Sequence, residues 1–206
     1  RMLMNKGIPL KEAYDWNPAG CVETNLDGRL RHYSAFADIN LGGIIEFALT
    51  NGVNRKTGRK VATETGDPTT FETYEDFENA VKEQLKYSVR ICVKESHIID
   101  DICMDRIVPA LSLSFRECVK NAKDYAWGGA KYNTGNGIIL IGVADLINSM
   151  EAIRDLVYDR KLVSMEDMVK ALDADFEGYE EIQKLCKESH KYGNDDDDVN
   201  DICLLY

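Results

Sequence analysis

The sequence has few of the features that mark several large protein classes. Its 206 residues include 25 Lys and Arg against 36 Asp and Glu, giving a formal net charge of −11. Phosphate backbones and anionic membrane surfaces reward clustered positive charge, so this balance argues against unassisted binding to nucleic acid or to membranes. Small molecules and other proteins are the expected partners.

The cysteine usage is also that of a particular class. The six cysteines contain no Cys-x-x-Cys pair and are scattered along a chain too long to need disulfide staples. This pattern predicts a reduced, cytoplasmic protein. The longest apolar run, residues 137–147, contains Asp145 and is too short to cross a bilayer. No signal peptide precedes Arg1, which is not a start residue, so we expect a fragment of a longer protein.

Metal and nucleotide motifs are missing from the sequence. The three histidines are far apart, so no two imidazoles share a helix face as a zinc site needs. The acidic tail "NDDDDVNDI" lacks the central glycine and the final glutamate of an EF-hand calcium loop. The glycines of "GNGIILIG" fail the spacing of a dinucleotide-binding loop and predict turns instead. We expect no metal ligands in this chain.

The hydrophobic pattern predicts helices joined by loops, with little of the alternation that marks long strands. Apolar residues recur at helical spacing over residues 41–49, and a polar loop follows at residues 54–70. Residues 74–106 contain no Pro or Gly and predict one or two long helices, with Thr73 and Asp76 as a cap and Pro109 beyond the end.

The second half of the chain predicts further short elements. "PALSLSF" indicates a short strand, a helix follows it, and the apolar run after "AKYNTGNG" indicates a buried strand. Three more helices are expected over residues 149–158, 164–172 and 177–187, with Ser164 as a cap. Cysteines in the helical patterns are expected to act as small buried hydrophobes: Cys92, Cys103 and Cys118.

The stretch Gly20-Cys21-Val22-Glu23 is the strongest candidate for chemistry. If it is extended, Cys21 and Glu23 point to the same side, because successive side chains of a strand alternate. It lies in a loop with Pro18, and loops held on a scaffold often carry function. A carboxylate beside a thiol disfavours the thiolate, which suits a hydrogen-atom donor better than a nucleophile. On these residues alone, an accidental acidic neighbour of a loop cysteine stays an open alternative.

Four stretches together resemble one known family. They are "AGCVETNLDGRL", "WGGAKYNTGNG", "IGVADLINSMEAIRDLVYD" and "DADFEGYEEIQKLCKESHKYGNDDDD". In this order they are similar to the catalytic-cysteine part of glycyl radical enzymes of the pyruvate formate-lyase-like family. The resemblance implies an α/β fold, in which residues 1–206 form a helix-rich part of one ten-stranded α/β barrel domain. The amino-terminal half and the glycyl radical domain, with its Arg-Val-x-Gly-Tyr loop, are expected outside these residues.

The resemblance implies a radical mechanism for the candidate pair. Cys21 would pass a hydrogen atom to a glycyl radical and then, as a thiyl radical, take one from a substrate carbon. Glu23 would act as an acid or base on the substrate, or hold its carboxyl group. Pyruvate formate-lyase itself has two adjacent cysteines, whereas Gly20 precedes a single cysteine here. The pattern therefore argues against formate acetyltransferase activity.

Substrate contacts are expected at further polar residues. Similar lyases line the pocket with residues that correspond to Ser34 and Asp38, although both could instead cap the helix over residues 41–49. Thr24 resembles the arylacetate decarboxylase branch, which favours a hydroxyphenylacetate-type decarboxylase with Asn54 as a contact for the ring hydroxyl. A dehydratase or carbon–nitrogen lyase acting on a diol, hydroxyproline or choline-like substrate is the alternative.

The resemblance also implies partners. A radical-SAM activating enzyme would install the glycyl radical, the remainder of the barrel would complete the site, and a homodimer is expected. No cofactor is expected to bind these residues directly. A catalytically dead helical binding protein that has kept the family shape is the competing class, and the acidic surface would suit it.

Overall fold

The computed structural model describes residues 1–20, 23–195, 199 and 201–202, with the side chains of residues 32–35 and 135 left out of the description. The chain divides into two compact units. Unit one comprises Arg1–Asp38 and Ile91–Ile139, and unit two comprises Ile39–Arg90 and Leu140–Tyr206. The two units are considered one at a time below.

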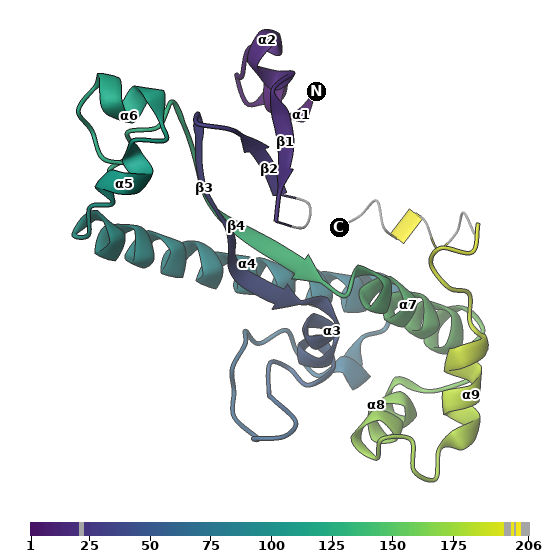
Figure 1. The fold of residues 1–206 in the computed structure, drawn as a ribbon. Helices are drawn as coiled ribbons and strands as arrows, with labels where there is room; N and C mark the ends of the chain where they lie inside the picture. Colours follow the sequence, from purple (N-terminus) through teal and green to yellow (C-terminus); the bar gives the residue numbers. More distant parts are fainter. Residues whose placement is uncertain (21–22, 196–198, 200, 203–206) are drawn as a thin grey trace. The chain divides into compact units, whose positions relative to one another are not determined.

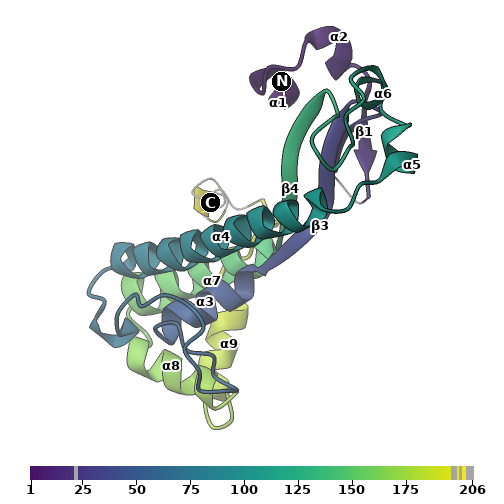
Figure 2. The same cartoon turned by 90° about the vertical axis from the view of Figure 1, so that its left-hand side faces the viewer.

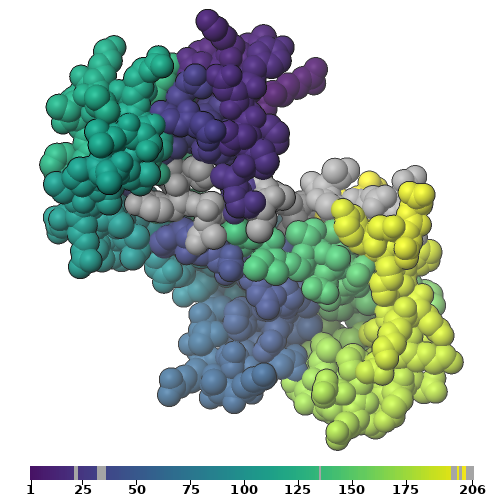
Figure 3. All heavy atoms as spheres, in the orientation of Figure 1, coloured from purple at the N-terminus to yellow at the C-terminus, as the bar shows by residue number. Residues whose placement is uncertain are grey.

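Unit one begins with two short helices, a β-hairpin and a long strand, and continues with the second part of a long helix, two more short helices and a second long strand. The elements in chain order are α1 (Met2–Asn5), α2 (Leu10–Ala13), β1 (Trp16–Ala19), β2 (Glu23–Leu26), β3 (Leu30–Asn40), α5 (Pro109–Ser112), α6 (Arg116–Lys120) and β4 (Tyr132–Ile141). The first part of the chain lies beside the segment that carries α5 and α6 (Figure 3), and a Cβ built at Gly28 would lie 3.0 Å from the carbonyl oxygen of Ser114.

The strands β3 and β4 lie side by side and run in the same direction (Figures 1 and 2). A parallel pair needs a long crossover connection, which here includes α4 (Tyr74–Met104). Each strand leads at once into a helix, β3 into α3 (Leu41–Leu49) and β4 into α7 (Val143–Ile153). This strand–helix order is the repeating unit of α/β barrels and confirms the predicted fold class.

Unit two is helical. It contains α3, the first part of α4, a 3-10 turn (Pro68–Thr70), α7 with a π-helical turn after it (Arg154–Asp159), α8 (Met165–Asp173) and α9 (Glu180–Glu188). Helix α3 packs against α7. A cluster of apolar side chains joins the π-helical turn to α8 and α9, with Leu156 and Met168 buried in it.

Several predicted elements are confirmed. The helix over residues 41–49 is α3, and the predicted stretch of residues 74–106 forms the single helix α4, which is 31 residues long and ends at Met104. The cap of α4 is the predicted one: the Thr73 hydroxyl accepts from the Asp76 amide at 3.2 Å, and an Asp76 oxygen accepts from the Thr73 amide at 2.9 Å. Ser164 caps α8 in the same way, accepting from the Asp167 amide at 3.0 Å.

Other predictions were wrong. "PALSLSF" is not a strand: its first residues form α5, in which Pro109 occupies the first helical position that suits its fixed φ. A distant carboxylate holds this turn, since Asp124 accepts from the Val108 amide at 3.1 Å and from the Ser112 hydroxyl at 2.8 Å. The expected scarcity of strands is also wrong, because residues 16–40 are mostly extended.

The apolar run of residues 137–147 does not form one buried strand. It is divided between the end of β4 and the start of α7, which begins six residues before the predicted residue 149. Leu140 and Ile141 at the end of β4 are 43% and 50% exposed. Of the helical cysteines, Cys118 is buried as predicted, whereas Cys92 and Cys103 on α4 are half-buried.

Candidate functional site

The predicted motif lies at the tip of the hairpin formed by β1 and β2. The two strands pair antiparallel, with Ala19 opposite Glu23 and Trp16 opposite Leu26. Residues 20–22 therefore connect them. Cys21 and Val22 fall outside the described residues, so the expectation that Cys21 and Glu23 share one face stays a prediction.

The described ends of this connection are close together. Gly20 has the left-handed φ of +59° that a non-glycine residue rarely adopts. Glu23 opens β2, is half-buried, and folds its carboxylate back over Gly20. A Cβ built at Gly20 would lie 2.7 Å from Oε2 of Glu23. The acid of the motif thus rests against the backbone next to Cys21 in the sequence.

A small core fixes the base of the hairpin. Leu26, at the end of β2, is 0% exposed and packs with Ile8 and Leu30. Between the strands, the side-chain amide of Asn25 donates to Oδ1 of Asn17 at 3.0 Å. Burial of a leucine is worth about 2 kcal/mol, so this cluster gives the motif a firm support.

A polar network at the same place centres on Glu12 of α2. Its carboxylate accepts from the ammonium of Lys131 and from the hydroxyl of Tyr132, the latter at 3.0 Å. Arg29, which donates to Asp15 at 2.8 Å, lies nearby. The hydrogen bond from Lys131 holds the pKa of Glu12 below its ordinary value. This network ties the first helices to the start of β4.

In unit one, both long strands are fastened to α4. Arg31 of β3 is 7% exposed, forms an ion pair with Asp100 at 2.9 Å, and lies over the ring of Tyr125. Asn136 of β4 donates to the Ser96 hydroxyl at 2.9 Å. Ser96 and Asp100 are one helical turn apart and therefore share a face of α4. The sequence pattern missed these contacts, because the partners are far apart along the chain.

The predicted substrate residues Ser34 and Asp38 both lie in β3. The alternative that they cap the following helix is wrong: Asn40 is the N-cap of α3, and its Oδ1 accepts from the Gly43 amide at 3.2 Å. Asp38 is exposed. Their even separation places positions 34 and 38 on one face of a regular strand, so their role in a pocket stays a prediction.

The third predicted substrate residue, Asn54, belongs to unit two. Its Oδ1 accepts from the Thr57 amide at 3.0 Å and from the Thr57 hydroxyl at 3.1 Å. Its own amide donates to the carbonyl of Arg59 at 2.9 Å. These contacts hold the turn of the loop after α3, and they account for a polar residue here without a substrate.

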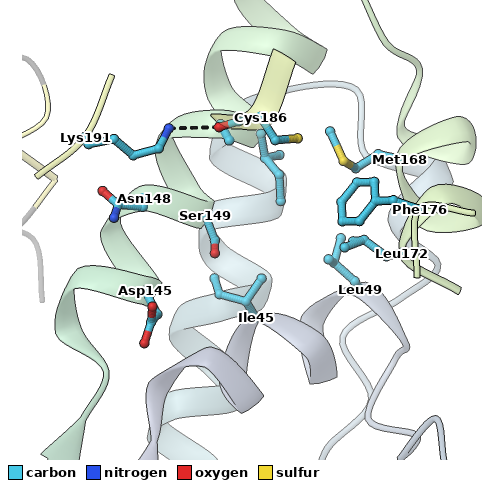
Figure 4. Close-up of a pocket in the computed structure, with 12 residues that line it drawn as sticks. Ile45, Leu49, Asp145, Asn148, Ser149, Met168, Leu172, Phe176, Cys186 and Lys191 are labelled. Carbon is cyan, nitrogen blue, oxygen red and sulfur yellow. Dashed lines mark hydrogen bonds between the residues drawn. The ribbon is translucent and has the colours of Figure 1, made fainter. Parts of the chain in front are cut away.

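Unit two contains a pocket of about 310 Å³ between α3, α7, α8 and α9 (Figure 4). Apolar side chains of Leu49, Leu172 and Phe176 line one side, and Asn148 with Asp145 lies on the other. The Lys191 ammonium donates to the carbonyl of Cys186 at 2.8 Å. Asn54, which belongs to the same unit, is not among the residues that line this pocket.

Two further findings concern the described part of the chain. Within it, His, Cys, Asp and Glu side chains do not gather in groups of three or more that could hold a metal ion. Within the same residues, each helix is too short or too polar to span a bilayer.

Comparison with known proteins gives a consistent result. Residues 1–204 match the family described as pyruvate formate lyase-like. The trans-4-hydroxy-L-proline dehydratase of Clostridioides difficile is 37% identical over 202 residues, which is 97% of this chain and 25% of that protein. The (2S)-3-sulfopropanediol dehydratase of Klebsiella oxytoca is 31% identical over 97% of this chain and 24% of its own length.

Structural comparison agrees. The crystal structure of the C. difficile hydroxyproline dehydratase with trans-4-hydroxy-L-proline bound superposes with a TM-score of 0.92, covering 97% of this chain and 25% of that one. The glycyl radical subunit of 4-hydroxyphenylacetate decarboxylase from Clostridium scatologenes is 24% identical over 98% of this chain and 27% of that protein. The chain thus spans about a quarter of the length of its curated relatives. With its matching fold and its Gly-Cys-Val-Glu hairpin, the chain belongs to the pyruvate formate lyase-like family of glycyl radical lyases and dehydratases.

Proposed function

We propose that the whole protein is a glycyl radical dehydratase, or a related eliminating lyase, that acts on a small hydroxylated molecule through Cys21 and Glu23. The observation that carries this proposal is the 37% identity with a hydroxyproline dehydratase, against 24% with the decarboxylase subunit, over nearly the same residues. Elimination therefore fits better than the arylacetate decarboxylation that Thr24 favours. The related isethionate sulfite-lyase of Desulfovibrio desulfuricans, 30% identical over 95% of this chain and 24% of its own length, is also named for an elimination.

Cys21 is the hydrogen-atom relay in this proposal. A glycyl radical in another part of the whole protein takes the hydrogen atom of the Cys21 thiol, which breaks the S–H bond, forms a C–H bond at the glycine and leaves the unpaired electron on sulfur. The Cys21 thiyl then takes a hydrogen atom from the substrate carbon next to the one that bears the leaving group, which forms an S–H bond and breaks a C–H bond. The hairpin supports this role, because the strands on either side of Cys21 in the sequence are paired with each other and Leu26 of β2 is buried.

Glu23 is the proton acceptor. Its carboxylate takes the proton from the heteroatom on the radical carbon, and this makes the neighbouring hydroxyl depart more readily. The hydroxide combines with that proton to form water, and the product radical takes a hydrogen atom back from the Cys21 thiol. The substrate loses one water, and no external oxidant or reductant is consumed. General acid–base help of this kind contributes about 10²- to 10⁴-fold to a rate.

The remaining roles concern substrate binding and the partners of the whole protein. Ser34 and Asp38 of β3 would bind polar groups of the substrate, and Asn54 stays a candidate whose described contacts explain it as a turn residue. The whole protein would require a radical-SAM activating enzyme and would work without oxygen. The rest of the barrel would close the site, and a homodimer is the expected assembly.

A substrate panel tests the proposal. The whole protein, activated without oxygen, is incubated separately with trans-4-hydroxy-L-proline, a 1,2-diol, isethionate and 4-hydroxyphenylacetate, and products are identified by mass spectrometry. We expect loss of water or sulfite from one of the first three compounds and no methylated arene from the last. Formation of the arene, or full turnover by a Cys21→Ala variant, would overturn the proposal.

A further inference from the structure

The connection between β1 and β2 contains a feature that the proposed chemistry does not yet use. Gly20 immediately precedes Cys21, and it adopts a φ of +59°. Resting on the proposed function of Glu23, we propose that Gly20 is a positioning residue. Because Gly20 has no side chain, the Glu23 carboxylate can lie against its backbone, next to Cys21 in the sequence.

The Glu23 carboxylate fills the space that a side chain at Gly20 would need. Ala19 is opposite Glu23 in the hairpin register, so the Glu23 side chain starts beside the Gly20 backbone. A Cβ at Gly20 would lie 2.7 Å from Oε2, 3.1 Å from Oε1 and 3.2 Å from Cδ of Glu23. All three atoms belong to the Glu23 carboxylate. A residue with any side chain therefore cannot keep the carboxylate where it is.

The clash would displace the carboxylate and leave the hairpin in place. The Glu23 carboxylate is the end of a flexible side chain, and rotation about its bonds relieves the contact. The hairpin is anchored elsewhere, by the buried Leu26 and by the Asn25–Asn17 hydrogen bond. The separate strain of a left-handed backbone at a non-glycine residue also arises when another left-handed glycine is replaced, so it can be controlled for.

Gly7 offers that matched control. It belongs to the same unit and has a left-handed φ of +84°, but a Cβ built there meets nothing within 4 Å. Gly7→Ala therefore introduces the backbone strain of Gly20→Ala without pushing on a carboxylate. A difference in turnover between the two variants therefore reports on the position of the Glu23 carboxylate.

The proposal predicts which step fails. With the carboxylate displaced, Cys21 still takes a hydrogen atom from the substrate, but the proton is not removed and the leaving group stays. The substrate radical then takes a hydrogen atom back from the thiol. In D₂O the thiol exchanges its hydrogen with solvent, so recovered substrate gains deuterium although little product forms.

The experiment uses the activated whole protein in D₂O with the best substrate of the panel. Glycyl radical content is measured by EPR, and product and substrate deuteration by mass spectrometry. For Gly20→Ala we expect turnover per radical to fall by about 10²-fold or more, the lower end of a general-base contribution, with substrate deuteration at least as fast as in the wild type. Gly7→Ala should keep wild-type turnover.

A Glu23→Gln variant, measured in the same way, distinguishes the role of Glu23 as proton acceptor from the positioning role of Gly20. If Glu23→Gln keeps wild-type turnover, the proposed role of Glu23 is wrong. If Glu23→Gln loses turnover while Gly20→Ala keeps it, the positioning role of Gly20 alone is overturned. Loss of both turnover and substrate deuteration in Gly20→Ala would also overturn it, since a general disturbance of the connection would then explain the loss.

Discussion

At the scale of single residues, the supports of the hairpin matter as much as the motif at its tip. Glu12 gathers Lys131 and Tyr132 at the base of the hairpin, and Leu26 fills the core beneath it. Neither would be chosen as functional from its type alone. Their effect is to fix the backbone on which Cys21 and Glu23 are carried.

The network at Glu12 gives a prediction about pH. Because the hydrogen bond from Lys131 lowers the pKa of Glu12, its stabilising effect is present above the ordinary value of 4.5 and is lost as the pH falls through the lowered pKa. Glu12→Gln should therefore lower the melting temperature of the whole protein at neutral pH, and the difference from wild type should shrink in acid. The exposed Glu177→Gln is the control, and an equal difference at all pH values would contradict the prediction.

A second residue-scale prediction concerns Gln84 of α4. Gln84 is 0% exposed, and its amide donates to the carbonyl of Thr63 at 2.8 Å and to the Thr65 hydroxyl at 3.1 Å. Gln84→Leu leaves the Thr63 carbonyl without this donor and should cost about 1–3 kcal/mol of unfolding free energy, measured in urea. Gln183→Leu, which removes only a surface contact with Lys187, should cost far less. Equal losses would contradict this reading of Gln84.

At the scale of elements, helices were predictable where their signals are local. The apolar spacing of α3 and the caps of α4 and α8 involve residues within a few positions of one another. The strand β3 and the turn α5 were missed because their partners are distant: Asp100 for Arg31, and Asp124 for Ser112. Tertiary contacts override local propensity at such places.

The cap of α4 carries an element-scale prediction. Thr73→Ala removes the hydroxyl that accepts a hydrogen bond from the Asp76 amide in the first turn of the helix. This loss should cost about 1 kcal/mol of unfolding free energy at neutral pH. The hydrogen bond from Thr73 lowers the pKa of Asp76, so this stabilisation should fade as Asp76 protonates in acid. Thr73→Ser keeps the hydroxyl and should behave as wild type. If Thr73→Ser lowers the unfolding free energy as much as Thr73→Ala does, the loss comes from the packing of the Thr73 methyl group and the prediction is wrong.

A further prediction concerns the ion pair between Arg31 of β3 and Asp100 of α4. Asp100→Asn removes the negative charge that pairs with the nearly buried guanidinium of Arg31 at 2.9 Å, and loss of one partner of a buried pair costs about 3–5 kcal/mol. Asp100 is itself partly exposed, so we expect the lower end of that range or somewhat less. Glu83→Gln on the same helix breaks an exposed pair with Lys86 and should cost about 0.5 kcal/mol or less. Urea unfolding of both variants measures the difference.

At the scale of the whole molecule, the sequence predicted the family and the barrel type but not the substrate. Four short motifs carry the family resemblance, and they lie within residues 1–206. The contact between Gly20 and the Glu23 carboxylate was not predictable, because it depends on how the Glu23 side chain folds back over the Gly20 backbone. The substrate preference depends on side chains around the whole pocket, and this chain spans about a quarter of its relatives.

The central claim is that Cys21 transfers a hydrogen atom to and from the substrate. The most direct measurement compares wild type and Cys21→Ser in the activated whole protein, with product formed per glycyl radical counted by EPR. Serine keeps the shape of cysteine, but its O–H bond is too strong for this transfer. We predict that the variant retains the glycyl radical and forms no detectable product. Product formation by Cys21→Ser at a rate close to that of the wild type would contradict the account.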